Sequence, residues 1–373
     1  MLTKTMLLPQ SGVRRRRQFM RAAATLGAAS ALALGVASAA AQQTINVTFA
    51  AGFAPNATFV GAVVNGYVPA VDRELAKTGK YRIRWNLAHS GQIAKPRGEL
   101  DAVQGGLADM GVLPVPYYFD RIPLYEVLYV TPFAAHDVDV VAKAFDQLEA
   151  RFPQVHEAWA RVNQKVLATT PNADATIISV NRPVRTVADM KGLKIGAVGP
   201  NSPWIAHAGA TPVQAALSDW YLGINNGTMQ GALAFPQALG SFKLCQVAKF
   251  AVDPGLGVAG GVALTVNLNF WNKLPPEVQQ VLQEQAKVYN TEQVRLLREG
   301  SRTAMEGCRK EQGFTEISLS TEERAKWANG MPNLGQEWAT RMDHQGQPGR
   351  QVLAFWMDQM RAANQPIIRQ WDR

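Results

Sequence analysis

Apolar and polar positions along the chain repeat with two periods, in two separate regions. In the first region, strand-like alternation or apolar runs occupy residues 45–50, 81–87 and 108–113, with helix-like spacing at 60–75 and 98–106. In the second region, strand-like segments occupy 165–168, 176–180, 192–198 and 231–234, and 217–226 is helix-like. Alternating strands and helices predict a parallel α/β sheet in each region. Two such units predict two lobes, with a cleft at the carboxyl ends of the strands where small ligands bind.

A long helical pattern follows the second unit. Leu274–Glu277 reads LPPE, with prolines suited to a first turn and an acid suited to the positive end of a helix. The pattern continues to about Gln312, before Gly313, which is roughly 55 Å at 1.5 Å per residue. A helix of this length would span both lobes, although Gly300 and Gly307 weaken the prediction that it is unbroken. We interpret the tryptophans beyond it as packing anchors: Trp327, Trp338, Trp356 and Trp371.

The first 41 residues have the layout of an export signal. Basic residues at Arg14–Arg17 precede the apolar stretch Ala22–Ala37, and small residues at 37–41 suit cleavage. The apolar stretch is short for a membrane span. Arg16–Arg21 (RRQFMR) resembles the twin-arginine export motif, and an ordinary secretory signal with extra arginines is the alternative. We therefore predict a mature periplasmic protein that begins near residue 42.

Removal of this segment changes the charge of the chain. It carries six basic and no acidic residues, so the formal charge falls from +9 to +3, which gives no reason to expect a nucleic acid partner. Cys245 and Cys308 are the only cysteines. An oxidising periplasm would allow a disulfide, and two buried free thiols are the open alternative.

The sequence carries no pattern typical of an enzyme. Its five histidines do not share metal-ligand spacing with one another or with a cysteine, and it has no Gly-x-Ser-x-Gly elbow. Residues 255–260 fit Gly-x-Gly-x-x-Gly, but they precede a strand-like segment at 262–266, whereas a phosphate site needs a helix there. We interpret them as a flexible connector, and predict no enzymatic activity, no metal and no cofactor.

Four motifs occur in an order typical of one family. They are ELDAVQGGLADMG at 99–111, DMKGLKI at 189–195, GATP at 209–212 with SDWY at 218–221 and NGTMQG at 226–231, and FWNKLP within 269–282. Together they cover nearly all of the chain after the leader. The chain thereby resembles the solute-binding subunit of tripartite ATP-independent periplasmic (TRAP) transporters.

The resemblance implies a fold, partners and a mechanism. The fold is an α/β two-lobed periplasmic binding protein, type II-like, with a long helix spanning both lobes. The expected parts are a signal at 1–41, lobe I at 42–172 plus about 255–297, and lobe II at 173–254 plus about 298–373. A monomer would capture a small organic solute and pass it to the small and large TRAP membrane subunits, which use an ion gradient.

The sequence departs from the family where a carboxylate is usually bound. An arginine that makes charge-assisted hydrogen bonds is expected on the strand after KGLK, where this chain has Gly196. A second basic position falls near Thr176, and two polar positions fall on Ala234 and Ala50. The resemblance therefore implies that the usual carboxylate clamp is absent.

Bulky side chains lie in loops that should face the cleft: Phe53, Tyr117, Tyr118, Trp204, Trp220 and Phe235. Aromatic walls without the family's arginine predict an aromatic or otherwise bulky solute, and core packing is the alternative for these residues. The predicted ligand-binding set combines aromatics with small or polar replacements: Phe53, Tyr117, Thr176, Gly196, Trp204, Trp220, Ala234 and Phe235. His89, Lys95 and Arg97 could bind a carboxylate elsewhere, although a solvated face is the simpler interpretation.

Two other functions fit a cleft of this kind. A periplasmic sensor would present the same clamp to a signalling receptor, and neighbouring genes for a kinase or for transporter subunits would separate the two. A periplasmic enzyme on a binding-protein fold is the third hypothesis, against which stands the lack of catalytic motifs.

Overall fold

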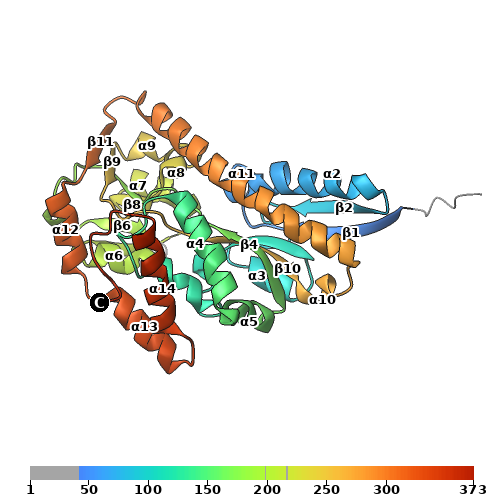
Figure 1. Cartoon of the computed structure of the whole chain (residues 1–373). Coiled ribbons are helices and arrows are strands. Elements are labelled where there is room, and N and C mark those ends of the chain that lie inside the picture. Colours follow the sequence, from blue (N-terminus) through green and yellow to red (C-terminus); the bar gives the residue numbers. More distant parts are fainter. Residues whose placement is uncertain (1–41, 198, 216) are drawn as a thin grey trace, which may run out of the picture. The chain divides into compact units, whose positions relative to one another are not determined.

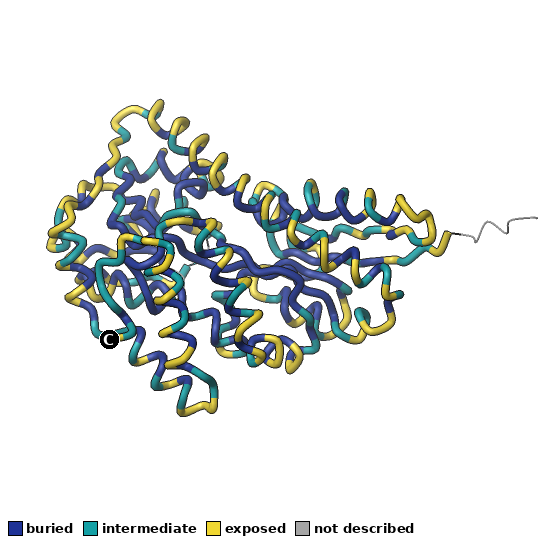
Figure 2. The backbone as a smooth tube through the Cα atoms, viewed as in Figure 1, coloured by how far each residue is buried: buried dark blue, intermediate teal, exposed yellow. Residues whose placement is uncertain are grey.

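The computed structural model describes residues 42–197, 199–215 and 217–373 (Figure 1). The predicted export signal at 1–41 lies outside the described residues. Two sheets organise the described chain, as expected from the two α/β patterns. Figure 2 shows a buried interior in both parts of the chain. Four strands are buried throughout: β3 (Met110–Pro114) and β10 (Val262–Asn267) of the first sheet, and β5 (Ile177–Val180) and β8 (Gly231–Ala234) of the second.

The first sheet has the strand order β2-β1-β3-β10-β4. Its strands are β1 (Gln43–Ala50), β2 (Tyr81–Ala88), β3 (Met110–Pro114), β4 (Gln164–Thr170) and β10 (Val262–Asn267). β1 pairs in parallel with β2 and β3, as the alternation of strands and helices predicts. β10 runs antiparallel to both of its neighbours, which corrects the expectation of a wholly parallel sheet. Every residue of β3 and β10 is buried, which is why these central strands are apolar almost throughout.

The second sheet has the order β11-β9-β5-β8-β6-β7. Its strands have four residues each: β5 (Ile177–Val180), β6 (Lys194–Ala197), β7 (Thr211–Gln214), β8 (Gly231–Ala234), β9 (Phe250–Asp253) and β11 (Thr315–Ser318). β6 lies parallel to β7 and β8, whereas β5 lies antiparallel to β8 and β9, so the expectation of a parallel sheet is corrected here as well. We refer to the parts built around the two sheets as the first and second lobes.

Short helices connect the strands of each lobe. Those of the first lobe are α1 (Thr58–Ala62), the π-helix η1 (Val63–Tyr67), α2 (Val68–Thr78), α3 (Glu99–Gln104), the 3₁₀ turns η2 (Val115–Tyr117) and η3 (Pro123–Leu128), α4 (Val138–Arg151), α5 (Pro153–Arg161) and α10 (Leu268–Trp271). Those of the second are η4 (Val187–Met190), η5 (Gly199–Asn201), α6 (Ser202–Ala206), η6 (Leu217–Asp219), α7 (Trp220–Asn225), α8 (Pro236–Ser241) and α9 (Leu244–Val247). The chain ends in α12 (Thr321–Gly330), α13 (Leu334–His344) and α14 (Gly349–Ala362).

Helix α11 (Pro276–Cys308) is a single element of 33 residues (Figure 1). It contacts α1, α2 and β4 of the first lobe and α8 of the second, so it spans both as predicted. Gly300 does not break it. A Cβ at Gly300 would lie 3.3 Å from Cβ of Gln237, so glycine lets α8 approach the long helix closely.

The connector at 254–261 joins β9 of the second lobe to β10 of the first without an intervening helix. Gly255, Gly257 and Gly260 all have positive φ, which glycine adopts at little cost. A side chain at Gly257 would also collide with the carbonyl oxygen of Ala135. These constraints support the interpretation of the glycine-rich motif as a connector.

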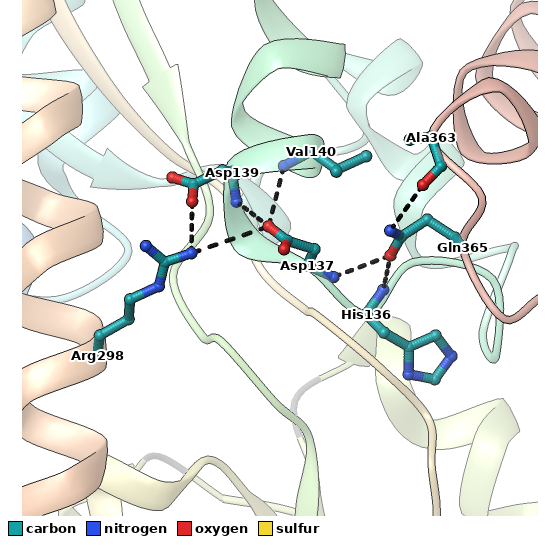
Figure 3. A network of polar contacts seen from close by, with 7 residues as sticks. All are labelled: His136, Asp137, Asp139, Val140, Arg298, Ala363 and Gln365. Carbon is teal, nitrogen blue, oxygen red and sulfur yellow. Dashed lines mark hydrogen bonds and ion pairs between the residues drawn. The ribbon is translucent and has the colours of Figure 1, made fainter.

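A polar network ties the start of α4 to α11 and to the chain beyond α14 (Figure 3). Asp137 caps α4 by accepting hydrogen bonds from the backbone N–H groups of Asp139 and Val140. Arg298 of α11 pairs with the carboxylate of Asp139. The side-chain oxygen of Gln365 accepts from the backbone N–H groups of His136 and Asp137, at 2.8 and 3.0 Å.

Cys245 in α9 and Cys308 at the end of α11 form a disulfide, with Cα atoms 5.6 Å apart. This observation decides between the two alternatives left open by the sequence. The four tail tryptophans are buried, each with at most 1% of its surface exposed, which confirms their role as packing anchors. Among the described residues, no helix has the length and apolar character needed to cross a bilayer.

Candidate functional site

An open cavity of about 450 Å³ lies among loops of both lobes, and we call it the outer cavity. Its volume is within the range of small-molecule sites. Residues of the first lobe lining it include Phe53, Phe59, Ser90, Arg97, Pro114 and Tyr117. Residues of the second lobe and the connecting segments include Asn172, Leu217, Ser218, Phe235, Gln237 and Phe242.

A smaller cavity of about 60 Å³ adjoins it, and we call it the inner chamber. Five residues line both spaces: Pro114, Tyr117, Asn172, Leu217 and Phe235. Other residues line the inner chamber but not the outer cavity, among them Thr176, Asn201, Trp220 and Ala234. Its volume suits a few water molecules or one functional group of a ligand.

Both spaces lie where strands end. Phe53 follows β1, Ser90 follows β2 and Tyr117 follows β3 in the first lobe; Asn201 follows β6 and Phe235 follows β8 in the second. Loops at the carboxyl ends of parallel strands are the usual location of ligand sites in α/β sheets. The arrangement therefore presents loops from two sheets to one ligand.

The structure brings most of the predicted site residues together. Phe53 lines the outer cavity, and Tyr117 and Phe235 line both spaces. Thr176 and Ala234 line the inner chamber with Trp220. These positions agree with the proposed roles, which stay predictions until a ligand is bound.

Trp204 and Tyr118 are placed differently. Trp204 is fully buried, stacks on Tyr129 with ring centroids 5.6 Å apart, and donates its indole N–H to the Tyr129 carbonyl at 2.8 Å. It lines neither space, so we correct its assignment to core packing. Tyr118 is also buried, and its hydroxyl donates to the Glu99 carboxylate at 2.8 Å.

Gly196, another predicted site residue, lines neither space and lies directly behind Trp220. A Cβ at this position would be 3.0 Å from Nε1 of Trp220 and 3.0 Å from Sδ of Met229. Both side chains are buried, and Trp220 Nε1 donates to the carbonyl of Ala215 at 3.3 Å. The indole thus occupies the space that a longer side chain on β6 would need.

Arg97 is the only charged residue among the described residues that line either space, and no carboxylate lines them. Its guanidinium carbon lies 4.9 Å from the centroid of the Tyr117 ring, within cation–π distance. Its φ is 75°, a left-handed conformation that costs a non-glycine residue energy and is frequent at functional sites. His89 and Lys95, the other two candidates, line neither space.

A buried carboxyl group supports the loop that carries Arg97. Glu99 is fully buried, and burial raises the pKa of its carboxyl group above the usual value, although the Tyr118 hydroxyl lowers it. A side chain at Gly52 would collide with this carboxyl group and with the Pro96 backbone. Glycine therefore lets the loop after β1 pack on the Arg97 loop.

Several polar residues of the site had no signal in the sequence. Asn172 and Asn201 line the inner chamber, and Gln237 lines the outer cavity. Gln237 donates to the Asn172 carbonyl at 3.2 Å and accepts from Ser301 of α11 at 3.0 Å. This chain of hydrogen bonds connects the cavity wall to the long helix. Within the described part of the chain, no group of three or more potential metal-ligating side chains gathers.

Comparison with known proteins gives one family. The model described as "Bacterial extracellular solute-binding protein, family 7" matches residues 70–342. The C4-dicarboxylate-binding periplasmic protein DctP of Rhodobacter capsulatus is 26% identical over 269 residues, which is 67% of this chain and 75% of that protein. A monocarboxylate 2-oxoacid-binding periplasmic protein of Nostoc sp. strain PCC 7120 is 23% identical over 60% of each chain.

Solved structures share the fold. A TRAP solute-binding protein from Rhodoferax ferrireducens T118, in complex with copurified benzoate, superposes with a TM-score of 0.74 at 19% sequence identity. The similarity covers 86% of this chain and 98% of that one. It confirms the two-lobed α/β architecture expected from the sequence.

Proposed function

The chain belongs to family 7 of the bacterial extracellular solute-binding proteins, and we propose that it captures a bulky, largely apolar organic monocarboxylate between its two lobes. The observation that carries this proposal is the outer cavity of about 450 Å³, in which Arg97 is the only charged side chain among the described lining residues. Aromatic rings from both lobes make up much of the remaining wall.

The general role follows from the family. The protein is the periplasmic solute-binding subunit of a TRAP transporter, it works with membrane TRAP subunits, and it is a binding protein rather than an enzyme. We further propose that it acts as a monomer. The sensor hypothesis predicts the same cleft, and a solute uptake assay in cells lacking this protein separates it from transport.

The proposal of a bulky solute rests on the composition of the wall. Phe53 and Phe59 contribute from the first lobe, Phe235 and Phe242 from the second, and Tyr117 lies at the junction of the two spaces. Aromatic side chains supply large contact areas for rings and other flat apolar groups. The Rhodoferax relative, which has the same fold, was solved with benzoate, which is a solute of this kind.

The proposal of a single carboxylate rests on charge. One cation and no acid among the described lining residues suit a ligand with one negative charge. A guanidinium binds a carboxylate through two parallel hydrogen bonds. A second carboxylate at Gly196 or Thr176 would have no cation nearby, and a buried unpaired charge costs several kcal/mol. The Nostoc relative is named for binding monocarboxylates, in keeping with this arrangement.

Capture by closure is the mechanism that fits this geometry. A ligand that contacts Arg97 and Tyr117 of the first lobe and Phe235 of the second stabilises the state in which the lobes are close together. Binding energy is thus used to select one conformation, which the membrane subunits can distinguish from the other.

A thermal-shift and calorimetry series tests the proposal. The purified protein is screened against benzoate, phenylacetate and cinnamate, against the short dicarboxylates succinate and malate, and against neutral benzamide. A true ligand at 100 times its dissociation constant adds about 2.7 kcal/mol of stability. We expect the aromatic monocarboxylates to raise the melting temperature and the short dicarboxylates to leave it unchanged.

The Arg97→Gln variant identifies the cation. A charge-assisted hydrogen bond contributes about 1.5–3 kcal/mol, so the dissociation constant of an aromatic carboxylate should rise about 10- to 100-fold. Arg73→Gln, at an exposed position of α2 outside both spaces, is the matched control and should bind like the wild type. A rise in melting temperature with succinate alone would overturn the proposed specificity. Unchanged affinity of Arg97→Gln for the aromatic carboxylate would overturn the role of this arginine.

A further inference from the structure

Two buried polar atoms in the inner chamber lack hydrogen-bond partners. Thr176 has 3% of its surface exposed and Asn201 has 9%. The hydroxyl oxygen of Thr176 and the side-chain oxygen of Asn201 both have no partner among the described residues. Among the described residues, these two are the unpartnered buried polar atoms that line the inner chamber or the outer cavity, where a water molecule or a ligand group can supply the missing hydrogen bonds.

We propose that the inner chamber is a second subsite, which binds a hydroxyl group of the solute between Thr176 and Asn201. This inference rests on the proposed function, because it concerns the opposite end of the same ligand. The solute would be a hydroxylated aromatic monocarboxylate, with its carboxylate at Arg97 and its hydroxyl in the chamber.

A hydroxyl group matches the two orphan atoms. It can donate one hydrogen bond to the Asn201 oxygen and accept one from the Thr176 hydroxyl at the same time. The indole N–H of Trp220, which also lines the chamber, already donates to the Ala215 carbonyl. The chamber volume of about 60 Å³ accommodates a single group of this size.

A second carboxylate does not fit this chamber. No charged side chain lies among the described residues that line it. A carboxylate only accepts hydrogen bonds, and its burial without a cation costs several kcal/mol. An apolar group fits no better, because it would leave both orphan atoms unpaired.

The different linings of the two spaces determine the orientation of the bound ligand. Arg97 lines the outer cavity but not the inner chamber, whereas Thr176 and Asn201 line only the inner chamber. Tyr117 and Phe235 line both and would enclose the apolar body between the two polar ends. The polar groups should therefore lie at opposite ends of the ring system.

Matched ligand pairs test this arrangement by calorimetry. The pairs are benzoate with para-hydroxybenzoate, phenylacetate with para-hydroxyphenylacetate, and phenylpropanoate with its para-hydroxy form, which differ in length. For the pair that fits best, we expect the hydroxylated member to bind about tenfold more tightly. Equal affinity within every pair that binds would overturn the second subsite.

Thr176→Val removes the hydroxyl with little change in shape, and should reduce the affinity ratio of the best pair to about one. Thr265→Val is the matched control. Thr265 is fully buried on β10, its hydroxyl also lacks a partner, and it lines neither space, so the ratio should persist. A ratio that persists in Thr176→Val overturns the proposal.

Folding of the variant is measured separately, by urea denaturation without ligand. Because the Thr176 hydroxyl has no partner in the protein, Thr176→Val should be at least as stable as the wild type. If no aromatic monocarboxylate binds the wild type, the proposed function itself fails. If aromatic monocarboxylates bind but the two members of every such pair bind equally, only the hydroxyl subsite fails.

Discussion

Replacing Gly196 by arginine installs the residue type that the resemblance described above implies for this strand, and the structure allows its effect to be estimated. A Cβ at Gly196 would lie 3.0 Å from both Trp220 Nε1 and Met229 Sδ, and 3.2 Å from Trp220 Cδ1. These neighbours are buried side chains and cannot move into solvent without loss of packing. The arginine must therefore displace Trp220 from the wall of the inner chamber.

Two magnitudes follow from this displacement. Overpacking of a buried site costs about 1–3 kcal/mol, which we expect as the fall in the free energy of unfolding. Loss of the Trp220 contact should raise the dissociation constant of an aromatic monocarboxylate by at least about tenfold, which corresponds to about 1.4 kcal/mol of binding free energy. The new cation should at the same time improve binding of succinate, because a second charge would have a partner.

Urea denaturation measures the first effect, and calorimetry with the best aromatic ligand and with succinate measures the second. Gly307→Arg adds the same charge at an exposed position of α11, where a Cβ would meet nothing within 4 Å; it should leave ligand binding unchanged and should not lower the free energy of unfolding, because arginine favours a helix more than glycine does. If Gly196→Arg binds the aromatic ligand with wild-type affinity, Trp220 is not a wall of the site and the placement of the pocket is wrong.

Three further predictions concern stability. Replacing Cys245 and Cys308 by serine opens a crosslink between residues 63 positions apart and should lower the free energy of unfolding in urea by about 4 kcal/mol; no difference from the wild type would contradict this. Burial raises the pKa of Glu149 from 4.5 to about 7, so the stability that the protonated carboxyl contributes below pH 4.5 is lost as the pH rises through 7. Since the residue is only half-buried, we expect the free energy of unfolding of Glu149→Gln to exceed that of the wild type by about 1–2 kcal/mol at about pH 8 but not at about pH 4. An equal gain at both pH values would show that protonation of Glu149 is not the cause. Asp137→Ala removes the cap of α4 and should cost about 1 kcal/mol of stability. Arg298→Ala breaks exposed ion pairs with Asp137 and Asp139 and should cost about 0.5 kcal/mol or less; the reverse order would show that the ion pairs matter more than the cap.

Much of the fold was predictable because local patterns determine it. The segments 45–50 and 81–87 alternate since each strand buries one face, and prolines in the LPPE segment at Leu274–Glu277 begin α11 where expected. The direction of β10 was not predictable. Residues 262–266 form an apolar run with no information on pairing, and the strand runs antiparallel to neighbours that are far away in sequence.

The site was predictable at strand ends and less so elsewhere. Phe53, Tyr117 and Phe235 follow strands, so the topology brings them together. The sequence predicts Trp204 and Trp220 alike to face the cleft, yet Trp204 in α6 packs on Tyr129 in the core while Trp220 at the start of α7 lines the chamber. That difference depends on tertiary neighbours, which a single sequence does not specify.

The same limit applies to the choice among His89, Lys95 and Arg97. All three follow β2 and carry or can carry positive charge, but only Arg97 lines the outer cavity. Its place depends on a left-handed backbone at Arg97 and on the buried Glu99 beneath the loop. Neither feature has a signature in the sequence, because both arise from packing against Gly52 and Tyr118.

The positions of Gly196 and Arg97 together determine which lobe offers a cation to the solute. With Trp220 over Gly196, the second lobe offers a ring contact and neutral polar atoms but no charge. A carboxylate must then be bound from the first lobe, where Arg97 rests on Tyr117. Because neither lobe alone provides contacts for both ends of the solute, full affinity requires closure, and a short anion that reaches only Arg97 gains little from it. In our proposal, specificity for long, ring-bearing monocarboxylates thus follows from the division of contacts between the lobes, in addition to the shape of either wall.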